Sequence, residues 1–244
     1  MKKNNIFWVI VLILFINSCQ QRHGDMAVIE GNLSDAAGTK LTLQEMDTHE
    51  IRPIDSIVLG QSGKFDFRPV TPEPGFWLLK SETGKVLVMM LDAGDKVTLT
   101  GSAHSFPDQV FLEGPRETKL LNDFFRYTRQ NELMVDSLEM LIAEHQDSSD
   151  YYQYTQKLDT IFKTIWENQR SYEMAFIDSY PGSLASLIVL NYAFGMSPVL
   201  SPEEDFGYYK KLDSALFRKF PENKHVKFHH QRVVEQNRKS SVTK

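Results

Sequence analysis

The stretch LEGPRETKLL, residues 112–121, divides the chain into two parts with different hydrophobic patterns. Before Gly114, apolar and polar residues alternate, and turn residues interrupt the alternation at intervals of about ten residues. After Pro115 the glycines become rare, and apolar residues recur every three or four positions. A period of two is typical of β-strands, and a period near 3.6 is typical of α-helices. The sequence therefore predicts an α+β chain in two parts, with the boundary at Gly114-Pro115.

The part before the boundary, residues 26–114, reads as a domain of short strands. The alternation is clearest in Lys64–Phe67 and Lys96–Thr100, and Gly60–Gly63 and Ala93–Asp95 have the composition of turns. Short strands at this spacing, without helices between them, predict an antiparallel β-sandwich or small barrel. The predicted strands are 27–33, 40–46, 51–59, 64–70, 75–81, 85–91, 96–102 and 109–114.

The part after the boundary, residues 115–238, is predicted to be all-α. Two apolar seams of alternating three- and four-residue steps flank the polar break at 146–150, and this pattern predicts a long helical hairpin. Pro181-Gly182 ends its second helix. A buried helix over 183–194 and a further helix from an N-cap at Ser201 to about Phe220 should follow. The seams consist of Leu120, Phe124, Tyr127, Asn131, Met134, Leu138 and Leu141, and of Tyr151, Tyr154, Leu158, Ile161, Ile165, Asn168 and Tyr172.

The N-terminus has the layout of a bacterial lipoprotein signal. Two lysines precede eleven apolar residues, Ile6 to Ile16, and Ser18 then stands before Cys19, the one cysteine of the sequence. Eleven helical residues rise about 16 Å, against a bilayer core of about 30 Å, so this run is too short to span. We expect a signal peptide over 1–18, acyl chains on Cys19, a tether over 19–25 and, at the other end, a tail over 239–244.

An acylated Cys19 would exclude several chemistries. No other thiol exists for a disulfide, a redox pair, a nucleophile or a zinc-thiolate site. The formal net charge is −5, and loss of the two lysines of the signal makes it more negative, which argues against nucleic acid as a partner. The expected partner is a membrane, reached through the lipid on Cys19.

No catalytic, cofactor-binding or metal-binding residue is predicted. The sequence contains no Gly-x-Ser-x-Gly, His-Glu-x-x-His or Walker motif. His225 and His229 are four residues apart, beside His230, and could share a helix face as metal ligands. The segment around them is rich in lysine and arginine. A solvated basic helix end is therefore the preferred interpretation of these histidines.

Several short motifs, in their order along most of the chain, resemble a known family. It is the all-β domain of unknown function, with its following helical segment, that begins Bacteroidetes lipoproteins of the thiol-disulfide oxidoreductase class. The motifs are Ile29-Glu30-Gly31, Ile54-Asp55-Ser56, Gly63 to Phe67, Gly94 to Val97, the step at Gly114, Phe176 to Ser183 and Phe220 to His225. The resemblance implies a lipid-anchored envelope protein.

The sequence also departs from that family. A thioredoxin-like domain with a Trp-Cys-x-x-Cys motif usually follows the helical segment, and this motif is absent here. No residue of this chain can therefore inherit the catalytic role. The acidic cluster that similar surface lipoproteins have behind the cysteine is missing from Gln20–Gly24. An outer-membrane protein that faces the periplasm is expected from this difference.

Three classes of function remain open. The first, which we prefer, is a non-catalytic accessory or interaction module, with a homodimer or an envelope protein as partner and Trp166, Phe162 and Phe125 as contact residues. Apolar side chains outside the seams suggest it, because a two-helix hairpin cannot bury them all. The second is a truncated or split thiol-disulfide oxidoreductase. The third is a periplasmic small-ligand binder with an aromatic pocket of Phe76, Trp77, Trp166 and Tyr192.

Overall fold

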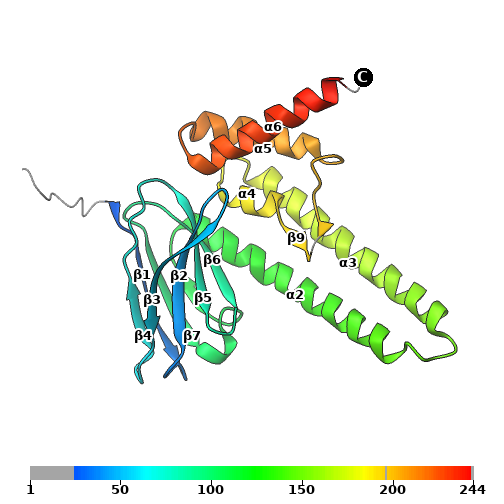
Figure 1. Ribbon diagram of the computed structural model, residues 1–244, viewed down its shortest axis with the longest axis horizontal. Helices are drawn as coiled ribbons and strands as arrows, with labels where there is room; N and C mark the ends of the chain where they lie inside the picture. Colours follow the sequence, from blue (N-terminus) through cyan, green and yellow to red (C-terminus); the bar gives the residue numbers. More distant parts are fainter. Residues whose placement is uncertain (1–24, 196, 243–244) are drawn as a thin grey trace, which may run out of the picture.

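The N-terminal part of the protein is a sandwich of two four-stranded β-sheets (Figure 1). The structure is a computed structural model, and it describes residues 25–195 and 197–242. Each of the eight predicted strands is confirmed. They are β1 Val28–Ser34, β2 Lys40–Met46, β3 Ile51–Val58, β4 Lys64–Phe67, β5 Gly75–Ser81, β6 Val86–Leu91, β7 Lys96–Ser102 and β8 Phe111–Glu113.

The two sheets share one apolar core. Their strand orders are β4-β1-β7-β8 and β3-β2-β5-β6, and side chains from both sheets, such as Ile29, Leu41 and Leu99, meet between them. The predicted sandwich is confirmed, but it is not wholly antiparallel, because β1 runs parallel to β7. After β1 the chain returns to the first sheet first as β4, antiparallel to β1, and then, after β5 and β6 in the second sheet, as β7, and such a crossover connection can place two strands in parallel.

Strands β5 and β6 are buried on both faces. Trp77 and Met89 point into the sandwich core, whereas Phe76 and Met90 point outward into a second core formed with the helices. This double burial explains why the sequences of these two strands are almost continuously apolar instead of alternating. The outer face of the second sheet is therefore the platform on which the helical part rests.

The helical part consists of five α-helices among the described residues. They are α2 Arg116–Glu144, α3 Tyr151–Ser179, α4 Ala185–Leu190, α5 Phe206–Lys219 and α6 Lys224–Val242, with a 3₁₀ turn η3 at Ala103–Ser105 and a small hairpin of β9 Ala193–Phe194 and β10 Ser197–Pro198. The predicted long hairpin is confirmed: α2 and α3 run side by side and extend away from the sandwich (Figure 1).

Two of the expected helix boundaries are wrong. The helix expected over 183–194 covers only α4, because Ala193 and Phe194 pair with Ser197 and Pro198 as strands. The helix expected from Ser201 begins at Phe206. The Ser201 hydroxyl does accept a hydrogen bond from the backbone N–H of Glu204, at 3.0 Å, but it caps a single turn before the helix. At the other end, α6 includes residues 239–242, which the sequence suggested to be a tail.

Polar contacts at the start of α6 also join the helical part to the sandwich, in addition to the apolar contact on β5 and β6 and the direct step from β8 into α2. The start of α6 lies on the sandwich, where the Asn223 amide donates to the carbonyl of Pro74 at 2.6 Å. The backbone N–H of Lys224 donates to Glu73 at 3.1 Å, and the Lys224 ammonium pairs with Glu45 and Asp47. These contacts tie the last helix to the strands and fix the helical part relative to the sheets.

No helix in the described part of the chain is long and apolar enough to cross a membrane. The predicted signal peptide, Cys19 and most of the predicted tether lie outside the described residues.

Candidate functional site

The hairpin of α2 and α3 contains the residues that the sequence assigned to partner binding. Its observed seam is formed in α2 by side chains three and four residues apart and in α3 by a matching series. Phe124, Asn131 and Leu138 belong to it, as expected. The full set is Leu121, Phe124, Thr128, Asn131, Val135, Leu138 and Ile142 in α2, and Leu158, Phe162, Ile165, Gln169, Glu173 and Phe176 in α3.

Leu158 and Ile165 of the predicted α3 seam also belong to the observed seam, whereas the predicted seam residues Met134, Leu141 and Ile161 are exposed. Positions three and four residues away from a seam residue lie on either side of it, so the sequence pattern fits two rotations of the helix. The first turns of α2 place Leu121 and Phe124 against β6 and α4. That contact selects the rotation in which positions 128, 135 and 142 face α3.

Four polar side chains form a layer inside the seam, which we call the polar layer: Thr128, Asn131, Gln169 and Glu173. The Asn131 amide donates to Gln169 Oε1 at 2.8 Å. Gln169 Nε2 in turn donates to the Thr128 hydroxyl at 3.1 Å and to Glu173 Oε1 at 2.9 Å. All four side chains are buried, so each hydrogen bond replaces one that water would otherwise make. The hydrogen bonds of the polar layer fix the register of α2 against α3 along their common axis.

Glu173 is the unusual member of the polar layer. Its side chain is 0% exposed, and among the described residues its Oε2 has no hydrogen-bond partner. Burial raises the pKa of this carboxyl to about 8, and the hydrogen bond from Gln169 and the nearby Arg170 only partly oppose the effect. Arg170 is engaged elsewhere, since its guanidinium makes a two-pronged pair with Asp205. Glu173 is therefore uncharged in the folded protein near neutral pH.

One member of the polar layer, Asn131, has a signal in the sequence. Asn131 was recognised as a polar interruption of an apolar seam, and a buried amide requires a partner at the same level. Asn168 was expected in the seam of α3, but the residue that bonds Asn131 is its neighbour Gln169. Glu173 was not identified, because a charged residue in a helix is ordinarily solvated.

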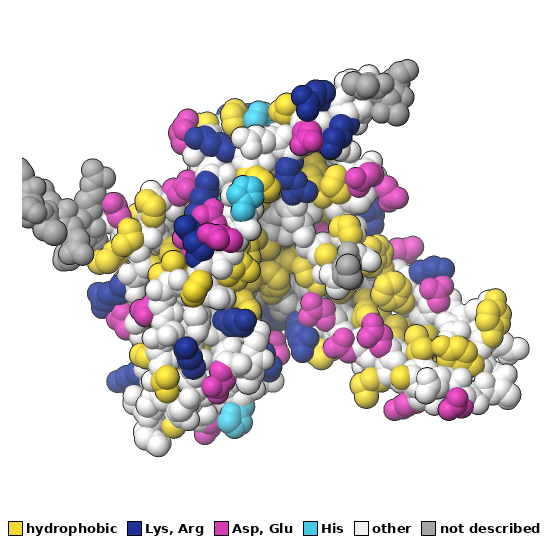
Figure 2. All heavy atoms as spheres, viewed as in Figure 1, with side chains coloured by type: hydrophobic (Ala, Val, Ile, Leu, Met, Phe, Trp, Pro, Cys, Tyr) yellow, Lys and Arg dark blue, Asp and Glu magenta, His cyan; other side chains and the backbone are white. Residues whose placement is uncertain are grey.

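The outer half of the hairpin has apolar side chains that nothing in the described chain covers. Fourteen large apolar residues are exposed in the described structure, and six of them lie between residues 134 and 161. Figure 2 shows hydrophobic side chains gathered there, with acidic side chains among them. We call this set the distal patch: Met134, Met140, Leu141, Tyr151, Tyr152 and Ile161.

The three predicted contact residues are half-buried and do not form one surface. Phe162 and Trp166 lie together in α3, with ring centroids 6.1 Å apart, and Trp166 also packs against Phe194 of β9 at 5.7 Å. Phe125 lies on α2 near β6, in a different hollow. Each of the three packs partly against the protein's own cores, so the distal patch is the more exposed apolar surface of the hairpin.

The histidines of α6 are not the solvated helix end that the sequence suggested. His225 and His229 are buried: His225 lies edge-on to Phe76, and a ring nitrogen of His229 bonds the carbonyl of Tyr209 at 3.1 Å. Burial lowers the pKa of His225 to about 4 and also lowers the pKa of His229. His230 pairs with Asp213 at 2.9 Å. Across the described residues, no group of three or more potential ligands could hold a metal ion.

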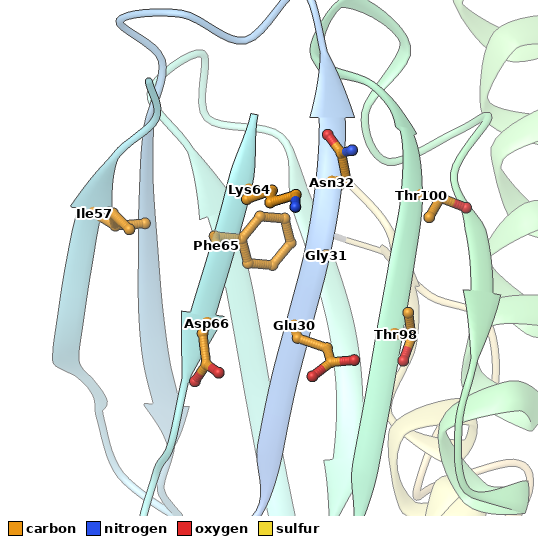
Figure 3. Close-up of a pocket in the computed structure, with 9 residues that line it drawn as sticks. All are labelled: Glu30, Gly31, Asn32, Ile57, Lys64, Phe65, Asp66, Thr98 and Thr100. Carbon is orange, nitrogen blue, oxygen red and sulfur yellow. The ribbon is translucent and has the colours of Figure 1, made fainter. Parts of the chain in front are cut away.

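A shallow hollow of about 560 Å³ lies over the first sheet (Figure 3). Two rows of polar side chains cross β4, β1 and β7 there: Asp66, Glu30 and Thr98 in one, and Lys64, Asn32 and Thr100 in the other. Glu30 already pairs with Lys96 at 2.8 Å, and Asp66 pairs with Arg68 at 2.9 Å. These carboxylates are compensated, and of the charged side chains in the lining only Lys64 has no ion pair within the described structure, so the hollow is an open, solvated sheet face.

Gly31 explains part of the shape of this hollow. The ring of Phe65 lies across Gly31, and a Cβ at that position would come within 2.5 Å of both the ring and the carbonyl oxygen of Leu99. Only glycine lets the ring approach the backbone of β1 so closely. The glycine of the Ile29-Glu30-Gly31 motif therefore has a packing role.

The aromatic pocket expected for a small-ligand binder does not exist as such. Phe76 and Trp77 are neighbours in β5 and point to opposite faces of the sheet, into separate cores. Tyr192 packs edge-on against Phe124 at 5.5 Å and donates a hydrogen bond to Glu132 at 2.8 Å, while Trp166 lies farther out on α3. The alternation of side chains along a strand separates the first two residues, and this alternative loses its structural support.

Comparison with known proteins adds no family. No family model and no curated protein matches this chain. An NMR structure of a protein from Eubacterium rectale covers 40% of this chain and 95% of its own length, at 10% sequence identity and a TM-score of 0.23. A likeness at this level carries no argument about fold or function.

Proposed function

We propose that this protein is a lipid-anchored module of the bacterial cell envelope that acts through contacts and not through catalysis. Its anchor is the lipid on Cys19, and it faces the periplasm from the outer membrane. Its working surface is the distal patch, through which two copies associate. The observation that carries the proposal is the concentration of exposed apolar side chains on the outer half of a hairpin that projects from the rest of the fold.

The shape of the hairpin favours a second copy as the occupant of the distal patch. A pair of helices with an apolar outer face can complete its packing by joining an identical pair, which gives a four-helix bundle. A two-fold axis makes the same patch serve both partners. Exposed apolar side chains gathered in this way on a soluble domain typically mark such a contact.

The polar layer supports a structural role for the inner hairpin. Its members are satisfied by one another apart from Glu173 Oε2, and they are closed to solvent. A buried polar residue in the seam between two helices is best known for fixing the register in which the helices pack and the partner they choose. The hairpin is therefore built to hold one fixed geometry, which a docking surface requires.

We expect the chain without residues 1–19 to associate through the distal patch. Met140→Glu with Tyr152→Glu should weaken the dimer by about a hundredfold or more, because two charges would enter an apolar contact. Light scattering or sedimentation over a range of concentrations measures the effect. Both side chains are strongly exposed, so the monomer fold should be unchanged.

The control is Val234→Glu, which adds a charge at an exposed apolar position of α6, outside the hairpin. It should leave the association constant unaltered. A wild-type protein that stays monomeric up to millimolar concentration, or a dimer that Val234→Glu weakens as much as the hairpin variant does, would contradict self-association through the distal patch.

The anchor is tested separately. Mass spectrometry of the membrane-extracted protein should show an N-terminal peptide that begins at Cys19 and has a lipid mass, and Cys19→Ser should abolish both the cleavage and the lipid. A purified protein that retains residues 1–18 with an unmodified thiol would exclude the lipoprotein proposal. It would leave the self-association result untouched.

A further inference from the structure

The last two helices contain an excess of positive charge within an acidic chain. Residues 206–242, which comprise α5, α6 and the turn between them, have nine lysines and arginines but only three aspartates and glutamates. The whole chain has 27 and 32 of these residues and a net charge of −5. Such an excess attracts a negatively charged partner if ion pairs within the protein do not neutralise it.

Ion pairs within the described chain leave much of this charge uncompensated. Each of the three acids already has a basic partner on the same two helices, and Lys211 and Lys224 pair with acids of other elements. The pairs of the three acids are Asp213–His230, Glu222–Lys227 and Glu235–Lys239. Five bases have no ion pair among the described residues: Lys210, Arg218, Lys219, Arg232 and Arg238.

Three of these five bases lie on one face together with two exposed apolar side chains. The buried side chains of both helices point into the helical core, so the opposite side of each helix faces outward. Lys219 and Arg232 are engaged away from this side, with the carbonyl of Gly182 at 3.0 Å and with Asn191 at 3.1 Å. Figure 2 shows basic and apolar side chains next to one another along the upper rim, over the last two helices. We call the outward side the basic face: Lys210, Phe217, Arg218, Lys227, Val234 and Arg238.

The basic face lies at the end of the molecule where the described chain begins. The carbonyl of Asp25 accepts from the backbone N–H of Thr71 at 2.6 Å, and Glu73 and Pro74, just beyond, hold the start of α6. In Figure 1, α5 and α6 lie at the top, and the α2–α3 hairpin points away to the lower right. Cys19 stands six residues before Asp25, which an extended chain spans in at most about 20 Å. A lipid on Cys19 would therefore hold this end of the protein close to the membrane.

We propose that the basic face rests on an anionic lipid surface, an inference that builds on the lipid anchor of the proposed function. Lys210, Arg218 and Arg238 bind headgroup phosphates, and the exposed side chains of Phe217 and Val234 enter the headgroup region. Bases around exposed apolar side chains are typical of surfaces that bind in this region. A bilayer is the favoured occupant because the anchor already confines the face beside it, which raises the effective concentration of headgroups. In this orientation the distal patch projects away from the membrane and stays open to a second copy.

Vesicle binding by the chain without its anchor tests the face by itself. Residues 20–244 retain every described residue and hence all the packed cores. This form should co-sediment with phosphatidylcholine vesicles that contain about one third phosphatidylglycerol, and should bind pure phosphatidylcholine at least about tenfold more weakly. Salt at about 1 M, where the Debye length is about 3 Å, should release it. Absence of binding to the anionic vesicles, equal binding to the neutral ones, or tighter binding to double-stranded DNA would each overturn the proposal.

A pair of charge variants locates the contact. Lys210→Gln with Arg238→Gln should weaken binding to the anionic vesicles by about thirtyfold, since each base near such a surface contributes about a factor of five. Lys80→Gln with Lys85→Gln is the matched control. It removes the same charge from two exposed lysines at the end of β5 and in the turn to β6, far from α6. The control should change binding by less than about threefold, and an equal loss in both variants would refute the assignment to the basic face.

Val234→Glu separates this surface from the distal patch. The variant is expected to leave self-association unaltered, but it places a negative charge inside the basic face. It should therefore weaken binding to the anionic vesicles by at least about tenfold. Unaltered vesicle binding in this variant would contradict the contact at α6.

The lipid-anchored full chain gives the orientation directly. On transfer from detergent into the anionic vesicles, Lys210 and Lys227 should become less reactive toward an acetylating reagent, while Lys80 and Lys85 should react as before. Protection of the second pair instead of the first would place the opposite end of the sandwich on the membrane and refute the proposal. Failure of the anchor itself would appear separately, as an unmodified Cys19 in mass spectrometry, and would leave the vesicle binding of residues 20–244 unaltered.

Discussion

Glu173→Gln is expected to stabilise the protein by on the order of 3–5 kcal/mol at pH 8 and by far less at pH 5. The folded state holds the pKa of this carboxyl near 8, whereas the unfolded chain ionises at its ordinary value of 4.5. Each unit of difference corresponds to about 1.4 kcal/mol. A carboxyl with a raised pKa stabilises the folded state only while the carboxyl is protonated. Its contribution to the free energy of unfolding is therefore complete below pH 4.5 and is lost as the pH rises to about 8.

The structure explains why glutamine suits this position. It keeps an oxygen to accept the hydrogen bond that Gln169 Nε2 now donates to Glu173 Oε1. It places an uncharged NH₂ where Oε2 already lacks a partner, so no new unsatisfied group arises. The variant has no titratable group in the polar layer and should lose the alkaline decline in stability.

Chemical unfolding of both proteins at several pH values between 5 and 9 measures the difference. Glu167→Gln is the matched control, because it makes the same change at an exposed position of the same helix. Its stability curve should stay parallel to that of the wild type. Parallel curves for Glu173→Gln would mean that Glu173 is ionised in the fold and that the polar layer admits water.

His225→Leu is expected to stabilise the protein by on the order of 2–3 kcal/mol at pH 4.5, and by little at pH 7.5. The pKa of His225 is about 4 in the fold and 6.5 in the unfolded chain, because burial disfavours the charged ring. A lowered histidine pKa means that the unfolded state takes up a proton first. Wild-type stability therefore falls as the pH drops from about 6.5 to 4, and the variant should keep only the part of this decline that comes from His229, whose pKa burial also lowers.

The site of His225 gives this prediction a local readout. The ring lies edge-on to Phe76 of β5, its Nε2 has no partner among the described residues, and Lys224 beside it holds the sandwich through Glu45 and Asp47. Hydrogen exchange at pH 4.5 should therefore rise first around residues 223–228 in the wild type. His104→Leu, at an exposed histidine before β8, is the control and should leave the acid decline intact.

Glu173→Gln should reduce the loss of stability at alkaline pH, and His225→Leu should reduce the loss at acidic pH. Each variant is therefore a control for the other. Glu173→Gln should not alter the acid decline, and His225→Leu should not alter the alkaline one, because the two groups belong to different helices and different contacts. A change of both declines by one variant would indicate a general effect on the fold instead of the titration of one group.

The eight strands and the hairpin could be predicted from the sequence because both depend on local periodicity. Alternation along Lys64–Phe67 and the spacing of Phe124, Asn131 and Leu138 are properties of neighbouring residues. The exceptions are informative. Ala193 and Phe194 pair with Ser197 and Pro198 in a short local hairpin instead of continuing the expected helix. Helix α5 begins five residues after Ser201, next to Asp205, which Arg170 of α3 holds.

What only the tertiary structure decided is which face of each element is buried and against what. Helix α2 has two apolar series that fit a seam, and its contact with β6 and α4 chose between them, which left Met134 and Leu141 in the distal patch. The burial of Glu173, His225 and His229 depends in the same way on side chains distant in sequence. Periodicity fixes the type of an element because it reflects backbone geometry within a few residues. Its rotation, and the pKa of a residue upon it, depend on the partner that packs there, which no local pattern specifies.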